Sequence, residues 1–210
     1  MTTRVLRVDP LTPDDAVLAE AAAIVAGGGV VAYPTDTLYA LAVDPRSDAA
    51  VDRLYRVKGR DVSVAVPLIA GSFGIAAAAG AFSDADLRLA RAFWPGPLSI
   101  VVPPSRALSQ RLLGTGATVA VRVPAHTVAR ALSLALGATI TSTSANLSGV
   151  PPTTQPDAVI DALGDRIDAI LDAGASPGGP PSTIVEIVDG TWQLRRAGAI
   201  AFDRVLEFAE

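Results

Sequence analysis

Residues 27–37 read GGGVVAYPTDT, and this stretch decides the fold class. Its three glycines end the helical pattern of residues 13–26, which has acidic residues at its start and apolar spacing after them. Residues 30–33 predict a short buried strand, and residues 34–37 form a polar segment at its carboxyl end. A helix, a buried strand and a polar loop in this order indicate an α/β fold with a ligand site at the strand ends.

The same alternation continues along the chain. Ser47 or Asp48 caps a predicted helix that ends at Lys58-Gly59-Arg60, Ser83 caps another, and residues 125–136 predict a third. Strands are predicted at 64–69, 98–102, 118–123 and 138–142, and Asp189-Gly190 predicts a hairpin between 183–188 and 191–195. We therefore predict one domain over residues 1–210, with a twisted mixed sheet, flanking helices and a concave ligand-binding surface.

Composition excludes several kinds of site and partner. The 210 residues contain no cysteine and one histidine, so disulfides, thiolate metal sites and histidine metal clusters are excluded. No apolar stretch resembles a signal peptide or a membrane span, so we expect a cytoplasmic protein without a membrane partner. The formal net charge of −4 argues against strong affinity for a nucleic-acid duplex.

The basic residues are unevenly divided, since only one of the 17 lysines and arginines, Lys58, is a lysine. Abundant Ala, Gly and Pro suggest a GC-rich genome in which lysine drifts to arginine wherever either serves. An ammonium and a guanidinium differ in shape, hydration and hydrogen-bond geometry, so the one remaining lysine is a candidate for a specific role. Chance is the alternative explanation.

Polar segments and cations follow the predicted strands. Residues 35–37, 142–148 and 182–183 supply hydroxyls and amides that could hold a carboxylate, an amine or phosphate oxygens, although Ser and Thr also make ordinary turns. Arg122 stands among apolar neighbours, where an ion pair and an anion-binding role are equally plausible. His126 receives no role, and Asp36 and Asp44 are weak candidates for Mg²⁺.

Seven motifs together resemble the Sua5/YrdC/YwlC family, whose members include threonylcarbamoyl-AMP synthases of the tRNA t6A pathway. They occur in family order between about residue 30 and residue 200. The matching segments are VAYPTDTLY (31–39), KGR (58–60), FWPGPL (93–98), VRVPAH (121–126), SANLSG (144–149), ST (182–183) and RAG (196–198).

The resemblance implies a short bacterial synthase that converts L-threonine, bicarbonate or CO₂ and ATP to threonylcarbamoyl-AMP and pyrophosphate. It further implies Mg²⁺ bound with the ATP and transfer of the product to the t6A machinery and tRNA. No residue is assigned as a direct metal ligand. By the same resemblance, the residues that contact threonine are Thr35, Arg122, Ser142 and Ser182, and those that contact ATP are Lys58, Thr118, Ser144, Asn146 and Arg196. Lys58 and Arg60 are the implied catalytic pair.

The chain departs from the family pattern most clearly at residues 61–66, DVSVAV, which are longer than usual and lack a polar group before Pro67. Two other functions are kept open. One is a double-stranded RNA or nucleic-acid-binding module, because members of the family have been associated with RNA binding, and the other, motivated by this altered segment, is a diverged nucleotide-binding relative without synthase activity.

Overall fold

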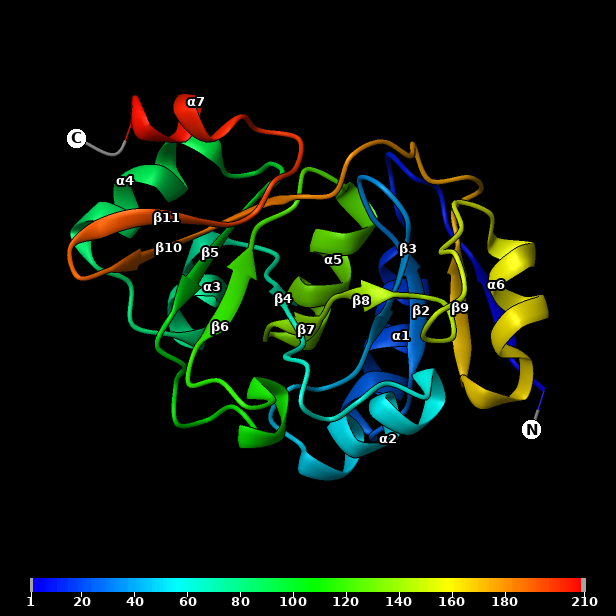
Figure 1. Cartoon of the computed structure of the whole chain (residues 1–210). Coiled ribbons are helices and arrows are strands. Elements are labelled where there is room, and N and C mark those ends of the chain that lie inside the picture. The colour runs from blue at the N-terminus through cyan, green and yellow to red at the C-terminus, as the bar shows by residue number, and fades with distance from the viewer. Residues whose placement is uncertain (1, 209–210) are drawn as a thin grey trace.

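Two mixed β-sheets form the framework of the chain, and a computed structural model describes its residues 2–208. The first sheet has the strand order β1-β9-β2-β3-β8, and the second has the order β11-β10-β5-β6-β4-β7. Figure 1 shows β1, β9, β2 and β3 on one side of the molecule and β5, β6, β10 and β11 on the other. The fold class is thus confirmed as mixed α/β, but the strands divide into two sheets where we predicted one.

The strands are short, and each sheet contains parallel and antiparallel pairs. The first sheet consists of β1 (Arg4–Arg7), β2 (Val31–Pro34), β3 (Tyr39–Ala42), β8 (Thr143–Ser144) and β9 (Ala169–Asp172). The second consists of β4 (Leu68–Ile69), β5 (Leu98–Val102), β6 (Val119–Arg122), β7 (Ile140–Thr141), β10 (Thr183–Val188) and β11 (Thr191–Arg196).

Helices cover the two sheets and connect their strands (Figure 1). They are α1 (Asp15–Ala26), α2 (Asp48–Lys58), α3 (Phe73–Ala79), α4 (Asp84–Phe93), α5 (Thr127–Leu136), α6 (Pro156–Leu163) and α7 (Phe202–Leu206), with short 3₁₀ turns η1 (Gln110–Leu113) and η2 (Gly164–Arg166). None of these helices is long and apolar enough to cross a membrane.

The predicted helix starts and turn are confirmed. The Ser47 hydroxyl accepts the N–H of Ala50 at the start of α2, and Ser83 forms a capping box with Asp86 at the start of α4. The hairpin turn also has the expected geometry, because Asp189 and Gly190 both have positive φ, 51° and 75°.

The predicted strand at residues 64–69 is wrong in its first half. Only Leu68–Ile69 is a strand, and residues 61–65 form an exposed loop. The carbonyl of Val64 accepts the hydroxyl of Tyr55, and the carbonyl of Ala65 accepts a guanidinium N–H of Arg60. Side chains therefore take the hydrogen bonds that a sheet ladder would have used.

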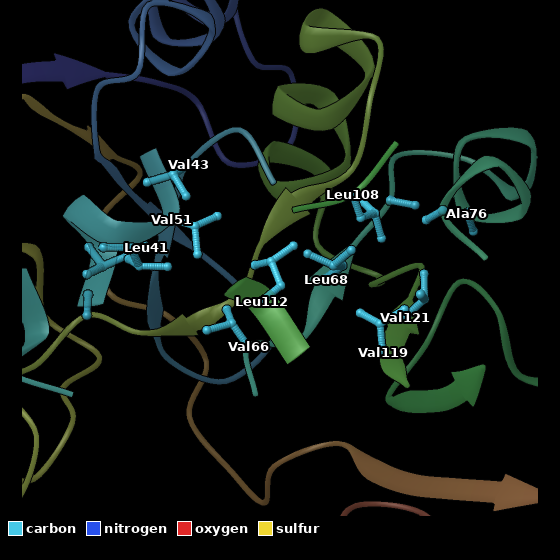
Figure 2. Packing of buried hydrophobic residues seen from close by; sticks show 14 of the residues in the cluster. Leu41, Val43, Val51, Val66, Leu68, Ala76, Leu108, Leu112, Val119 and Val121 are labelled. Atoms are coloured by element: carbon cyan, nitrogen blue, oxygen red, sulfur yellow. The ribbon is translucent and has the colours of Figure 1, made fainter. Parts of the chain in front are cut away.

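One hydrophobic cluster joins the two sheets. Leu41 of β3, Val51 of α2, Leu68 of β4 and Val121 of β6 all belong to it, as Figure 2 shows from close by. Ala40 and Ala42 of β3 instead belong to a second cluster with residues of α1 and α5. Side chains alternate along a strand, so one face of β3 packs into each cluster, and the strand is buried on both faces.

Candidate functional site

A cavity of about 280 Å³ is lined by residues from both sheets. Its walls come from β3 and β8 of the first sheet and from β4, β5 and β6 of the second. Seven of the ten predicted site residues line it: Thr35, Arg60, Arg122, Ser142, Ser144, Ser182 and Arg196. Six segments that lie apart in the sequence therefore meet at one site.

The chain passes from one sheet to the other beside this cavity. Ser142 lies between β7 of the second sheet and β8 of the first, and Ser182 ends the connection from β9 of the first sheet to β10 of the second. Backbone that leaves a sheet has polar groups without a ladder partner, so such junctions are suited to ligand binding. This explains why the serines of the two predicted polar segments converge.

Thr35 sits in a turn that uses its hydroxyl. Its Oγ1 donates to the carbonyl of Leu38 at 2.7 Å and accepts the N–H groups of Thr37 and Leu38, each at 3.3 Å. The turn-forming role considered for this segment is confirmed. Thr35 also lines the cavity, so its contact with threonine stays a prediction.

Arg122 forms an ion pair and also faces the cavity. Its Nη1 donates to Oδ2 of Asp36 at 2.9 Å, and only 8% of its side chain is exposed. Burial lowers the pKa of Arg122, and the negative charge of Asp36 opposes this shift. Within residues 2–208 its other N–H groups have no protein acceptor, so they can bind an anion in the cavity.

His126 lies close enough to Asp36 to sense its charge. Burial lowers the pKa of His126, while Asp36 raises it. The side chain does not cap α5, although it occupies the N-cap position, and it does not line the cavity. The structure therefore adds no role for this histidine.

A second arginine faces the cavity from β11. Nε and Nη2 of Arg196 donate to the carbonyl of Ser182 at 3.1 and 2.9 Å, and Nη2 also donates to the Ser182 hydroxyl at 2.8 Å. Burial is the main reason why the pKa of Arg196 is lowered, and the positive charge of Arg122 lowers it further. The two guanidiniums therefore repel each other across the site, and within residues 2–208 Arg196 forms no ion pair.

Lys58 is a buried residue, with 3% of its surface exposed, and it does not line the cavity. Its Nζ donates to the carbonyls of Ser144 and Asn146 and to Oδ1 of Asn146, and its own carbonyl accepts the N–H of Ser148. Burial, with a contribution from the charge of Arg60, lowers the pKa of Lys58 to about 8. The lysine therefore fixes the loop that carries Ser144.

Arg60 joins the cavity to the loop of residues 61–65. Its guanidinium donates to the carbonyl of Ala65 at 2.8 Å and to the Thr143 hydroxyl at 3.2 Å. On the other side of this loop the carbonyl of Ser63 accepts the N–H of Thr115 at 3.0 Å, and Gly114 allows this close approach, because a Cβ built on it would lie 2.1 Å from that carbonyl oxygen. The segment that departs from the family pattern is thus tied down on both sides.

Three predicted residues do not line the cavity: Lys58, Asn146 and Thr118. Asn146 Nδ2 donates to the carbonyls of Leu147 and Val150, which orders the loop behind the site. Thr118 precedes β6, whereas Arg122 ends it, and four residues of strand place them about 13 Å apart. Contacts of these three residues with ATP stay predictions.

Ser99 of β5 lines the cavity but was not among the predicted residues. It is 4% exposed, and its hydroxyl lies 3.0 Å from that of Ser182. It is the one polar residue in the strand sequence LSIVV, and it directly follows the FWPGPL motif. That isolated hydroxyl in an apolar strand was the feature of the sequence that could have identified Ser99 as a site residue.

The cavity is suited to an anionic small molecule. It contains three guanidiniums and several hydroxyls, although the whole chain has a net charge of −4. No group of three or more His, Cys, Asp or Glu side chains that could hold a metal occurs within residues 2–208. Hydrogen-bond donors, rather than a protein-held metal or a cysteine nucleophile, are what this site offers to a substrate.

These features define a mixed α/β protein with an anion-binding cavity at the junction of two sheets. Residues 23–198 match the model of the Sua5/YciO/YrdC family, which is described as "Telomere recombination". The chain belongs to this family, and the resemblance inferred from its motifs is confirmed.

Similar proteins of known sequence or structure support the assignment to the family. A threonylcarbamoyl-AMP synthase of Thiobacillus denitrificans is 41% identical over 164 residues, which are 78% of this chain and 87% of that protein. The crystal structure of P. abyssi Sua5 complexed with L-threonine has a TM-score of 0.92 at 29% identity and matches 98% of this chain. This chain spans only 61% of the length of P. abyssi Sua5. E. coli YciO has a TM-score of 0.87 at 26% identity, with 97% of this chain and 99% of that chain covered.

Proposed function

We propose that the chain is a threonylcarbamoyl-AMP synthase, which converts L-threonine, bicarbonate or CO₂ and ATP to threonylcarbamoyl-AMP and pyrophosphate. The observation that carries this proposal is the convergence of Arg60, Arg122 and Arg196 on one cavity lined with hydroxyls. Such a site can bind a carboxylate and a polyphosphate side by side. The name of the relative from Thiobacillus denitrificans supports the same activity.

Threonine would bind at the end of the cavity near Arg122. A guanidinium matches a carboxylate in a two-pronged arrangement, and Arg122 is already oriented by its ion pair with Asp36. Ser142 and Ser182 flank it with hydroxyls, and Thr35 closes the turn beside them. The threonine bound by P. abyssi Sua5 supports an amino-acid site in this fold.

ATP would bind towards Arg60, Ser144 and Arg196. The two arginines would neutralise the phosphates, while Lys58 and Asn146 would act from beneath by fixing the loop of residues 144–148. Mg²⁺ would arrive as part of the MgATP substrate. This fits the residues around the cavity, because the carboxylate of Asp36 is already engaged by Arg122.

The reaction needs no covalent enzyme intermediate. The threonine ammonium first releases a proton to solvent, the free amine forms a bond to CO₂, and loss of a second proton from nitrogen to solvent gives a carbamate. A carbamate oxygen then attacks the α-phosphorus of ATP, the bond from that phosphorus to the bridging oxygen breaks, and pyrophosphate leaves. Aligned reactants can reach effective molarities of about 10⁵ M or more, so positioning and charge neutralisation would provide the main rate enhancement.

The product would serve tRNA modification. Threonylcarbamoyl-AMP is a mixed anhydride that hydrolyses readily, so direct transfer to the enzyme that forms t6A at position 37 of tRNA would protect it. We place this activity in the cytoplasm, where ATP, bicarbonate and tRNA occur together.

A turnover assay tests the proposal. The protein is incubated with ATP, L-threonine, bicarbonate and MgCl₂, and pyrophosphate release is followed with and without threonine. We expect release that depends on threonine and on bicarbonate. ATP binding without threonine-dependent release would instead identify a diverged relative that binds nucleotide.

A further inference from the structure

Ser99 lies on the face of β5 that is turned to the cavity. Its neighbours Leu98 and Ile100 are fully buried in the hydrophobic cluster that joins the sheets, and side chains alternate along a strand. A buried hydroxyl on the opposite face requires a hydrogen-bond partner, and Ser99 finds it in Ser182, 3.0 Å away. Both oxygens border the same cavity.

The hydrogen bonds of this pair can be counted. Arg196 has no acceptor and must donate to Ser182 Oγ, which takes one lone pair of that oxygen. Between the two hydroxyls one oxygen donates and the other accepts. If Ser99 donates, the proton of Ser182 is unused, and if Ser182 donates, the proton of Ser99 is unused. Either way, one O–H donor remains within a cavity that both residues line.

The charges around this donor indicate its acceptor. Arg196 and Arg122 lie close enough for the positive charge of one to lower the pKa of the other, and the Arg122 ion pair with Asp36 uses only one of its N–H groups. A bound carboxylate would accept from the free hydroxyl and from the guanidinium of Arg122, and its negative charge would offset the repulsion between the two arginines. A neutral carboxamide would place an N–H₂ group against one of these donors.

We propose that Ser99 is a positioning residue for the amino-acid substrate: together with Ser182 it forms a hydroxyl pair that donates one hydrogen bond to the substrate carboxylate. This role rests on the proposed function and deepens it. The pair acts as a unit, because either serine alone still offers one hydroxyl, whereas loss of both removes the donor.

A double-mutant cycle tests this pairing. The variants Ser99→Ala, Ser182→Ala and the double variant are compared by initial rates of pyrophosphate release, with threonine and ATP varied in turn. Each single variant raises the KM for threonine about three- to fivefold, since a less well oriented hydroxyl remains. The double variant raises it on the order of a hundredfold, more than the product of the single effects, because the donor that the pair supplies to a charged group is then lost altogether. The KM for ATP changes less than twofold in Ser99→Ala.

Ser133→Ala is the matched control. Ser133 is also fully buried, accepts the N–H of Gly71 and donates to the carbonyl of Ala138, but it does not line the cavity. The Ser133→Ala variant should leave the KM for threonine unchanged, even if the substitution lowers the stability of the protein. Circular dichroism and urea unfolding establish that each variant is folded.

The outcomes separate the two proposals. An active wild-type protein in which Ser99→Ala leaves the KM for threonine unchanged, or raises both KM values equally, overturns the role of Ser99 and leaves the proposed function standing. Single effects that simply multiply in the double variant also overturn the pairing. A wild-type protein without threonine-dependent release overturns the proposed function and this inference with it.

Discussion

Replacement of Lys58 by methionine should loosen the loop that carries Ser144. The change keeps an unbranched side chain that is one atom shorter and removes the ammonium, which donates to three acceptors. Two of these acceptors keep a second donor, because Asn146 N donates to the carbonyl of Ser144 and Ser144 Oγ donates to Oδ1 of Asn146. Within residues 2–208 the carbonyl of Asn146 keeps none.

One buried carbonyl without a partner costs about 1–3 kcal/mol, so we expect Lys58→Met to lower the free energy of unfolding by about that amount. Urea unfolding followed by circular dichroism measures the change. Arg56→Met is the control, since Arg56 is an exposed cation on the same helix, and its loss should change stability by less than about 0.5 kcal/mol.

A second substitution at the same position, Lys58→Arg, should reduce turnover. Lys58→Arg keeps a positive charge, but a planar guanidinium cannot meet three acceptors that surround one nitrogen, so the loop would shift. We expect at least a tenfold lower rate of threonine-dependent pyrophosphate release, which corresponds to about 1.4 kcal/mol. Wild-type stability in Lys58→Met together with a wild-type rate in Lys58→Arg would refute the reasoning that the ammonium holds the loop.

Three further predictions follow from the site. Arg122→Lys keeps the charge but loses the two-pronged geometry, so the KM for threonine should rise about tenfold with little change in the KM for ATP; equal changes in both would show that Arg122 does not distinguish the substrates. Gly114→Ala should destabilise the fold by about 1–3 kcal/mol in urea, because Gly114 has a φ of 58° and faces the Ser63 carbonyl, whereas Gly116→Ala should cost clearly less; similar losses would contradict this. The pKa of Lys58 is about 8 in the folded chain and 10.5 as the ordinary value, so the unfolded chain binds more protons between these pH values. The free energy of unfolding of the wild type should therefore rise, relative to that of Lys58→Met, from about pH 8 to pH 10.5, and parallel curves would disprove the shift.

Local signals account for the parts of the fold that were predicted correctly. Ser47 and Ser83 bind N–H groups within their own first helical turn, and Asp189-Gly190 needs only its own two dihedral angles. Such features depend on a few adjacent residues, so sequence reveals them. The strand β5 was also predicted with its observed ends.

Long-range pairing accounts for the parts that were missed. The strand β1 is largely exposed and is held by β9, with Arg4 opposite Ala169. The division into two sheets follows from which strands pair, and no local pattern encodes that choice. Residues 64–66 have strand-like composition, but Tyr55 and Arg60 bind the carbonyls of Val64 and Ala65.

The candidate site was likewise predicted only in part, because its geometry depends on long-range contacts. The family motifs assigned Arg122, Ser142 and Ser182 to one site, and all three line the same cavity. Arg122 ends β6 and Ser142 follows β7, but Ser182 precedes β10, so the expectation that this last polar segment follows a strand is wrong. The position of Lys58 could not be foreseen, since its helix does not reveal that the side chain passes beneath the loop of residues 144–146. A cation in a binding motif can serve the site by holding its backbone.

Isotope labelling tests the central claim, that this cavity unites threonine, bicarbonate and ATP, most directly. The protein is incubated with L-threonine, MgATP and either ordinary or ¹³C-labelled bicarbonate, and the products are separated and weighed by mass spectrometry. We predict an adenylate whose mass equals that of threonylcarbamoyl-AMP and which gains the extra mass of the isotope. Pyrophosphate without this adenylate, or an adenylate that does not take up the label, would contradict the account.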